Sequence, residues 1–335
     1  MLILGIETSC DETAAAVLED GKKILSNIVT SQIPYHAVFG GIVPEIASRK
    51  HVEFIAFVVD TALKKANISL KDIDLIAVTV GPGLIGSLIV GMTFAKAISV
   101  SLNIKIVGVN HIEGHIKAIF LEKDIDFPFV ALVVSGGHTE LYIVYDHTNL
   151  KFFGKTRDDA AGEAFDKVAR ILDFGYPGGP IIDKLTQNLP KPKLSFPIAH
   201  IPNSYDFSFS GIKTAVLRYV KKHKKEIYNL NKKIEIANAF QWAVVEVLVE
   251  KTLSLAKNEN IRNIVVTGGV AANSLLRRVF LEKAKESGKN VYFPKKELCT
   301  DNAAMIAIAG YYRFLNGEKL DLEEDANPNL TLKET

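Results

Sequence analysis

The stretch LILGIETSCDETAAAVLEDGKKILSNIV (residues 2–29) reads as three strands joined by a polar turn and an Asp-Gly turn. The stretch FVALVVSGGHTELYIVYDHTNLKFFGK (residues 129–155) repeats this plan later in the chain. In each, an apolar run ends in a turn of small residues, first at residues 8–11 and then at residues 135–138. Three-stranded units are common, so a chance repeat stays open. The matching turns favour a duplication, which predicts two α/β lobes facing each other across a cleft.

Helical patterns follow both meanders, at residues 44–66 and 160–174. Two further joints place glycines between an apolar strand and a helix: Gly81-Pro82-Gly83 and Gly268-Gly269. Glycines at such joints let a ligand approach the backbone, and the helix N-terminus that follows favours an anion. Tight packing explains a single joint equally well. Neither joint matches the dinucleotide or Walker phosphate-binding pattern.

The composition is that of an ordinary globular protein, with 335 residues, 48% hydrophobic and 23% charged. The N-terminus has no basic region of the kind that opens a signal peptide. Residues 84–100 are apolar but carry Gly, Ser and Lys, which predicts a buried helix and no membrane span. The two cysteines, Cys10 and Cys299, form no disulfide framework. These features predict a cytoplasmic protein.

The net charge of +2 is unevenly distributed. Residues 151–233 hold 16 basic and 8 acidic side chains, and the densest part is YVKKHKKE at residues 219–226. Such a run is usually a solvated helix face, and the functional alternative is contact with a polyanion such as a nucleic acid. The candidate contact residues are Lys221, Lys222, Lys224 and Lys225.

Two histidines four residues apart occur in VNHIEGHIKA. On a helix, His111 and His115 would share one face and could bind one metal ion, although such a pair without a third ligand is often incidental. Glu113 would point roughly 200° away from them, which disfavours a zinc protease because its base must reach the metal-bound water. A third ligand would have to be a distant carboxylate. Asp301 precedes an apolar helix, where its ordinary role is capping, and spacing alone does not bring it to the histidines.

A series of long motifs runs through the chain from about Leu4 to about Ala307. These are GIETSCDETA, SQIPYHAVFGGIVPEIASRKH, GPGLIGSLIVG, VNHIEGHIKA, VSGGHTEL, GKTRDDAAGEAFDKVARILDFGYPGGP, FSFSGIKTA, VTGGVAANSLLR and LCTDNAAMIA. Together they resemble the TsaD family, the bacterial tRNA adenosine threonylcarbamoyltransferases, formerly labelled O-sialoglycoprotein endopeptidases.

The resemblance implies an actin-like ATPase fold of the sugar kinase and Hsp70 superfamily, with two duplicated α/β lobes and an interlobe cleft. We expect the first lobe at residues 1–127, with a C-terminal helix at about 301–316 packing back near it. We expect the second lobe at residues 128–300. Residues 317–335 are predicted to form a polar, loosely packed tail.

The resemblance also implies ligands for particular residues. His111, His115 and Asp301 would bind one divalent metal, iron or zinc. ATP, AMP or threonylcarbamoyl-AMP would bind in the cleft. The turn of Val134, Ser135, Gly136, Gly137 and His138 would hold the phosphate or carbamate. The remaining nucleotide and substrate positions would be Asp166, Gly179, Asp183 and Asn273.

The implied reaction transfers the threonylcarbamoyl group from threonylcarbamoyl-AMP to the N6 amine of adenosine 37, in tRNAs that read ANN codons, and releases AMP. A metal would act as Lewis acid, and the Ser-Gly-Gly amides would stabilise anionic oxygen. An arylamine is a weak nucleophile, so a carboxylate should accept its proton. Asp11 and Glu12 are the candidates, and turn formation is their alternative role.

The resemblance further implies partners: tRNA, a TsaB-like paralogue bound through the first lobe, a TsaE-like ATPase, and a TsaC-type synthase that supplies the adenylate. Residues 38–63 are the predicted pairing surface, unless that apolar helix is plain core. Two other functions stay open at this point. They are a metalloprotease, as in the old family label, and an actin-like ATPase or kinase, because a fold does not select a function.

Overall fold

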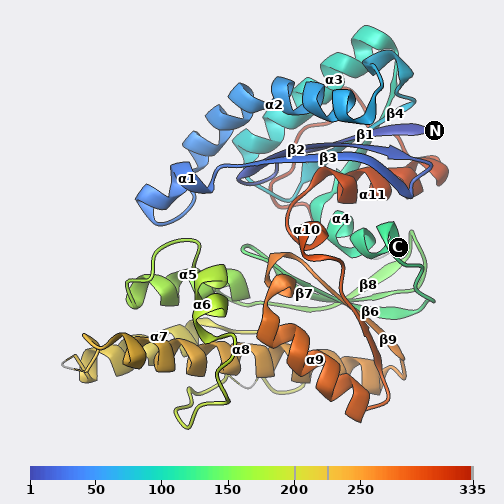
Figure 1. The fold of residues 1–335 in the computed structure, drawn as a ribbon. Coiled ribbons are helices and arrows are strands. Elements are labelled where there is room, and N and C mark those ends of the chain that lie inside the picture. The colour runs from blue at the N-terminus through green and yellow to red at the C-terminus, as the bar shows by residue number, and fades with distance from the viewer. Residues whose placement is uncertain (200, 225, 333–335) are drawn as a thin grey trace. The chain divides into compact units, whose positions relative to one another are not determined.

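The computed structural model describes residues 1–199, 201–224 and 226–332. The chain divides into two compact units. Unit 1 holds residues 1–125, 146–149 and the segment from Glu297 on, and unit 2 holds residues 126–145 and 150–296. Each unit is built on one five-stranded sheet with helices packed against it (Figure 1).

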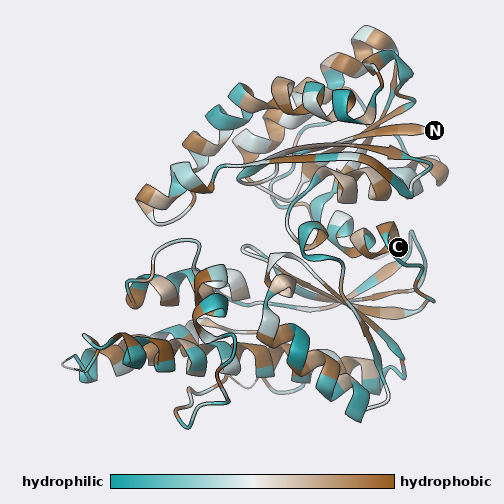
Figure 2. Ribbon diagram, viewed as in Figure 1, coloured by the Kyte–Doolittle hydropathy of each residue, from teal (hydrophilic) through white to brown (hydrophobic). Residues whose placement is uncertain are grey.

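The sheet of unit 1 has the strand order β3-β2-β1-β4-β5. Its strands are β1 (Leu2–Glu7), β2 (Glu12–Glu19), β3 (Lys23–Ser31), β4 (Leu75–Gly81) and β5 (Lys105–Asn110). The first three form an antiparallel meander, and β4 and β5 join it in parallel through β1. Strands β1 and β4 are almost wholly buried, which fits their nearly continuous apolar sequences, because helices cover both faces of the sheet. Figure 2 shows this as brown along the strands.

Helices α2 (Pro44–Ala66) and α3 (Ile85–Leu102) lie on one face of this sheet, and α11 (Ala303–Leu315) lies on the other (Figure 1). The core between the sheet and α2 and α3 includes Leu4, Ile55 and Met92. The approach of α11 is closer, since a Cβ on Gly5 would lie 2.2 Å from the carbonyl oxygen of Ala303. The short helices of unit 1 are α1 (Ile33–His36), η1 (Ala37–Phe39), η2 (Leu70–Asp72), α4 (His111–Lys117), η3 (Ala118–Leu121) and α10 (Lys296–Cys299).

Helix α3 is long and apolar enough to cross a membrane by length and composition alone. Within unit 1 it packs against α2 and β4, as a helix of a folded core does. Only 33% of its apolar window is buried, so the helix predicted to be buried is only partly buried within the described structure. Ile85 and Ile89 are exposed on its outer side.

The segment after Gly317 is ordered along unit 1, in contrast to the loosely packed tail that the sequence predicts. The amide of Leu320 donates to the carbonyl of Ile106 at 3.0 Å, and the amide of Asn327 donates to the carbonyl of Val80 at 2.9 Å. Leu320 and Leu330 pack against the core of the unit. The tail therefore pairs its backbone with β4 and β5, an interaction that its polar composition does not reveal.

Unit 2 repeats the topology of unit 1, with the strand order β10-β9-β6-β7-β8. Its strands are β6 (Phe129–Val134), β7 (Thr139–Val144), β8 (Leu150–Lys155), β9 (Asn263–Thr267) and β10 (Asn290–Tyr292). Its helices are α5 (Ala161–Ile171), α6 (Gly178–Thr186), α7 (Ser210–Lys222), α8 (Leu230–Asn258), η4 (Gly269–Ala272) and α9 (Ser274–Glu286). Strands β6–β8 again form an antiparallel meander, and β9 and β10 join it in parallel. The duplicated meander predicted from the sequence is confirmed.

Candidate metal centre and nucleotide-binding turn

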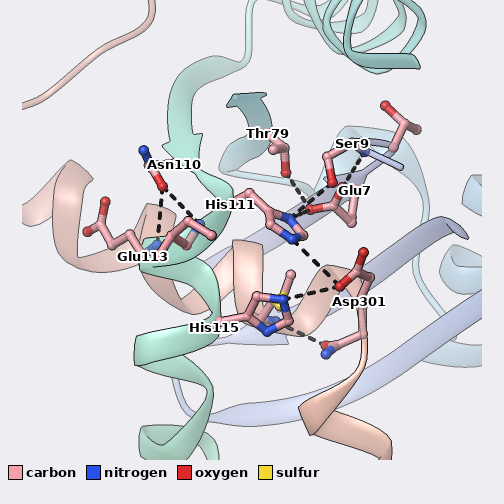
Figure 3. Close-up of polar contacts among 12 residues, drawn as sticks. Glu7, Ser9, Thr79, Asn110, His111, Glu113, His115 and Asp301 are labelled. Carbon is pink, nitrogen blue, oxygen red and sulfur yellow. Dashed lines mark hydrogen bonds and ion pairs between the residues drawn. The ribbon is translucent and has the colours of Figure 1, made fainter. Parts of the chain in front are cut away.

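Three side chains of unit 1 converge to form a candidate metal centre (Figure 3). His111 and His115 lie on α4, and Asp301 lies just before α11. Oδ1 of Asp301 is 3.1 Å from Nε2 of His115 and 3.6 Å from Nε2 of His111. One donor atom from each residue falls within 4.8 Å of the others. The fold thus brings together three residues that sequence spacing alone could not connect.

The start of α4 explains why both histidines share one face. Strand β5 ends at Asn110, whose Oδ1 accepts from the amides of Ile112 at 2.8 Å and Glu113 at 3.3 Å. This N-cap starts the helix directly at the strand end. The predicted helical spacing of His111 and His115 is therefore confirmed.

Asp301 does not cap the helix that follows it. That role belongs to Asn302, whose Oδ1 accepts from the amide of Met305 at 3.1 Å. The interpretation of Asp301 as a helix cap is wrong, because the neighbouring residue satisfies the free amide. The Asp301 carboxylate faces the two histidines instead (Figure 3).

Glu7 orients His111 from the opposite side. This fully buried carboxylate lies 3.0 Å from Nδ1 of His111, accepts from Oγ1 of Thr79 at 2.8 Å, and accepts from the amide of Ser9. A carboxylate at Nδ1 directs Nε2 of the ring toward Asp301, the usual arrangement behind a metal-binding histidine. Sequence analysis missed Glu7. The sequence feature that could have identified Glu7 is its position as an acidic residue at the end of an apolar strand.

The pKa values of the two histidines are shifted in opposite directions. Burial lowers the pKa of His111, but the carboxylates of Asp301 and Glu7 outweigh burial and raise it to about 9. Burial lowers the pKa of His115. The centre thus favours one positive charge between two carboxylates. Two imidazole nitrogens and one carboxylate oxygen are also a donor set that suits divalent iron or zinc, so the residues present fit such an ion.

Glu113 points away from this centre, as predicted from the sequence. Its carboxylate is 2.8 Å from Nη1 of Arg313, a residue of α11. A base for metal-bound water would have to face the same side as His111 and His115. Glu113 does not.

Asp11 lies on the turn between β1 and β2 of the same unit, and Glu12 is the first residue of β2. The pKa of Glu12 is raised well above its usual range, first by burial and then by the carboxylates of Asp11 and Asp301. The side chains of Asp11 and Glu12 also hydrogen-bond to each other. Burial likewise raises the pKa of the neighbouring Cys10 thiol, which stays neutral.

The turn after β6 is built differently, mostly from backbone. The amide of Ser135 donates to the carbonyl of His138 at 2.8 Å, and the amide of His138 donates to Oγ of Ser135 at 3.2 Å. Gly136 and Gly137 are exposed, and neither has a positive φ. A Cβ on either would meet no atom of the described chain within 4 Å. Val134, which precedes the turn, is the last residue of β6.

Three of the other predicted nucleotide residues are tied to helix starts within unit 2. Asp166 accepts from the amide of Gly178 at 2.7 Å, at the start of α6. Asp183 accepts from the amide and the hydroxyl of Ser274, at 3.1 and 2.6 Å. Asn273 caps α9 and donates to Gln241 at 2.8 Å.

The β9–α9 joint and the start of α5 both lie against the turn that follows β6 (residues 135–138). A Cβ on Gly268 would be 2.4 Å from the carbonyl oxygen of Val134, and the amide of Gly162 donates to the carbonyl of Ser135 at 3.1 Å. Gly179 is open by comparison, because its nearest atom to an added Cβ would be 4.0 Å away. Close packing therefore explains why residue 268 is a glycine. It does not explain the glycines at positions 179, 136 and 137, where an added Cβ would meet no closely packed atom of the described chain.

The lysine-rich stretch is partly described. Lys221 and Lys222 end α7, and Lys224 lies in the turn that follows; all three are exposed. Lys225 lies outside the described residues.

Comparison with known proteins identifies relatives of the whole chain. Residues 23–308 match the family TsaD, tRNA N6-adenosine threonylcarbamoyltransferase. A protein of that name from Thermodesulfovibrio yellowstonii is 56% identical, over 99% of this chain and 100% of its own. Another from Clostridioides difficile strain 630 is 53% identical, over 100% of this chain and 99% of its own.

Solved structures share the fold at low sequence identity. HypF from T. kodakarensis superposes with a TM-score of 0.63 at 14% identity, over 94% of this chain and 48% of that protein. Component A of (R)-2-hydroxyglutaryl-CoA dehydratase from Acidaminococcus fermentans gives 0.56 at 16% identity, over 93% and 98%. The predicted actin-like ATPase fold is confirmed.

Proposed function

Because the chain belongs to the TsaD family, the tRNA N6-adenosine threonylcarbamoyltransferases, we propose that it transfers a threonylcarbamoyl group to the N6 amine of adenosine 37 in tRNA. The donor is threonylcarbamoyl-AMP. A bond forms between N6 and the carbamoyl carbon, the bond from that carbon to the phosphate oxygen breaks, AMP leaves, and the amine loses a proton. The observation that carries the proposal is the convergence of His111, His115 and Asp301 in a chain of this family.

His111, His115 and Asp301 would hold one divalent ion, iron or zinc. Bound there, the ion would supply Lewis-acid stabilisation of the negative charge that builds up on oxygen during acyl transfer. Glu7 supports this role because it holds Nδ1 of His111 and so leaves Nε2 to face Asp301.

The Asp11–Glu12 pair would take the proton of the attacking amine. A general base works best when its pKa lies near the working pH, and the raised pKa of Glu12 moves it in that direction. The neighbouring carboxylate of Asp11 contributes to the raised pKa of Glu12. A structural role for Asp11 is compatible with this, because its backbone carbonyl, and not its side chain, accepts from the amide of Gln32 at 2.9 Å.

The nucleotide part of the donor would bind unit 2. Gly136 and Gly137 are exposed, and backbone amides in such a glycine turn suit an anionic oxygen, for which the missing side chains leave room. Val134, Ser135 and His138 complete this turn. The proposal extends to Asp166, Gly179, Asp183 and Asn273, which gather at the starts of α6 and α9.

tRNA would contact the exposed lysines at the end of α7, Lys221, Lys222 and Lys224, and also Lys225. Each lysine near a phosphate adds affinity that falls as salt rises. Replacing all four with Gln should weaken tRNA binding and reduce its salt dependence. Unchanged affinity and salt slope would remove these residues from the tRNA-binding surface.

A TsaB-like paralogue would pair with unit 1 through the apolar surface of residues 38–63 and the neighbouring α3. This surface is not plain core, because Val38 is 79% exposed and Phe57 67% exposed. Val52 on α2 and Ile89 on α3 are exposed as well. Exposed apolar clusters of this kind favour a protein partner. A TsaE-like ATPase, a TsaC-type synthase and a cytoplasmic location complete the proposal.

The test is a transfer assay with TsaB and TsaE, synthetic threonylcarbamoyl-AMP and unmodified tRNA. Wild type is compared with His111→Ala, Asp301→Asn and Glu12→Gln, with metal content measured in each. We expect the first two variants to lose metal and transfer together, and Glu12→Gln to keep metal but transfer slowly. Transfer at wild-type rates by metal-free His111→Ala would refute the metal role. Neither a protease nor a kinase activity is favoured by the family, and the Glu113–Arg313 pair removes the protease base.

A further inference from the structure

Helix α4, which carries the two histidines of the candidate metal centre, packs against α11. Gly114 lies at the contact, since a Cβ placed on it would be 2.8 Å from Cδ1 of Ile306 and 3.3 Å from Cγ of Met305. A larger residue would require the packed side chains of Ile306 and Met305 to shift. The glycine between the two histidines thus permits a short distance between α4 and α11.

A partly buried ion pair joins the same two helices. Glu113 of α4 is only 6% exposed, and its Oε2 is 2.8 Å from Nη1 of Arg313 on α11. Nη2 of Arg313 is in turn 2.5 Å from Oε2 of Glu318, which follows the end of α11. The guanidinium is therefore held by two carboxylates at once, and this restricts how far Glu113 can move.

The ligands of the candidate metal centre belong to these two helices. His111 and His115 flank Glu113 on α4, and Asp301 precedes α11 by two residues. Any slide of α4 along α11 would change the distances from the histidine Nε2 atoms to Oδ1 of Asp301. Metal ligands tolerate displacements of only about 0.5 Å.

We propose that Glu113 and Arg313 are positioning residues for the metal centre. Their ion pair, together with the close contact at Gly114, holds α4 against α11 in the register at which His111, His115 and Asp301 share one ion. This inference rests on the metal site of the proposed function. It assigns a role to Glu113, the acidic residue of the HIEGH motif that has no place at the metal.

Two other roles for the pair make different predictions. If it only stabilises the fold, its loss lowers the melting temperature and leaves the metal affinity of the folded protein unchanged. If it acts on the ion through charge alone, removing Glu113 weakens cation binding and removing Arg313 strengthens it. A positioning role predicts weaker metal binding from either removal.

The experiment measures Zn²⁺ affinity of the full chain by calorimetric titration, and the melting temperature of the metal-free protein. The variants are Glu113→Ala, Arg313→Ala and the double variant. Each single variant should lose affinity about 10- to 100-fold, as is typical for residues behind a metal ligand. The double variant should lose no more than the worse single one, because both act through one contact. Lys117, whose charge also acts on Glu113, remains to limit the folding cost in Arg313→Ala.

Two controls separate the possible failures. Ile55→Ala removes core contacts between α2 and the sheet of the same unit, so it should lower the melting temperature with zinc affinity unchanged. Glu113→Gln keeps the size and a hydrogen-bond acceptor for Arg313, and should recover part of the affinity that Glu113→Ala loses. It also serves as the test variant if the alanine variants do not fold.

The outcomes are distinct. Zinc affinity within twofold of wild type in the folded Glu113 and Arg313 variants would overturn the inference, and so would a gain of affinity in Arg313→Ala. If wild type does not bind zinc, or His111→Ala binds it equally well, the proposed metal site fails instead.

Discussion

The turn after β1 and the turn after β6 occupy the same place in two copies of one topology. They differ in composition, because one presents polar side chains and the other presents mainly backbone. The first is lined by carboxylates and histidine, with Glu7 accepting from Ser9 and Thr79 and facing His111. The second is a loop of exposed backbone, in which Gly136 and Gly137 touch nothing within 4 Å of where a Cβ would be, among the described atoms.

The difference shows how a duplicated fold can supply two kinds of binding chemistry. Side chains that converge from α4, β1 and the start of α11 suit a cation, and must be held by further buried partners because unpaired charges are costly to bury. Bare amides suit an anion and need only a turn of the right shape. Metal binding at the first turn should therefore respond to substitutions of residues that do not touch the ion. Anion binding at the second turn should respond only to side chains added to the turn itself.

The largest effect should come from removing a metal ligand. His111→Ala and Asp301→Asn should abolish stoichiometric zinc or iron binding, measured by elemental analysis of the purified protein. AMP affinity, measured by calorimetry, should stay within about twofold because the nucleotide residues belong to unit 2. Loss of AMP binding in the same variants would contradict the separation of the two chemistries.

The second turn can be tested by adding a side chain. Gly137→Val should lower AMP affinity by about 100-fold, since the new side chain fills space left for the ligand. Its melting temperature should hardly change, because the added atoms meet no described atom within 4 Å.

Gly268→Ala is the matched control. Its φ is +92° and its Cβ would be 2.4 Å from the carbonyl oxygen of Val134, so it should destabilise the protein measurably. Equal melting temperatures for the two variants would mean that the openness of Gly137 has been misread.

The first turn can be tested through a residue that never touches the ion. Glu7→Gln keeps the volume but removes the charge that holds Nδ1 of His111, and should weaken zinc binding about 10- to 100-fold. Thr79→Val is the control, because it removes only one hydrogen bond to Glu7 and should cost less. Unchanged zinc affinity in Glu7→Gln would show that His111 is held by its helix alone.

The smallest expected effect is a loss of folding stability at acidic pH. Burial lowers the pKa of His147, in unit 1, to about 4, and the ring stacks on Tyr312 at 3.6 Å. The unfolded chain binds this proton near pH 6.5 and the folded chain only near pH 4, so stability is lost as pH falls from 6.5 toward 4. His147 is half-buried, so the loss should be no more than about 1 kcal/mol.

His147→Phe keeps a stacked ring and cannot titrate. Urea unfolding at pH 7 and pH 5 should show a smaller difference between the two pH values for this variant than for wild type. An equal difference would place the acid sensitivity in other groups.

The architecture was predictable from the sequence because its signals are local. The two meanders, the helices at residues 44–66 and 160–174, and the strand–helix joints all follow from apolar periodicity and glycine placement. The helical pairing of His111 with His115 was predictable for the same reason. The tail was misjudged because its backbone pairs with Val80 and Ile106, a contact that depends on distant strands.

The residues that support the candidate metal centre could not be predicted from the sequence, for a related reason. Glu7, Thr79 and Arg313 come from β1, β4 and α11, and nothing in their local sequences refers to α4. Asp301 was assigned to the centre only through the family resemblance. Its local reading as a cap was wrong because Asn302 does the capping.

Unit 1 is built from segments that lie on both sides of unit 2 in the chain, so the order of synthesis decides when it can be completed. Its histidines precede unit 2 in the chain, whereas Asp301, α11 and the paired tail follow unit 2 and are therefore synthesised after it. The continuous stretch of unit 2 between Leu150 and Lys296 emerges before them and can fold first, as domains do during translation. The candidate metal site therefore cannot form before the segment that follows unit 2 is made, and a chain cut short before Asp301 would carry two histidines but no complete site.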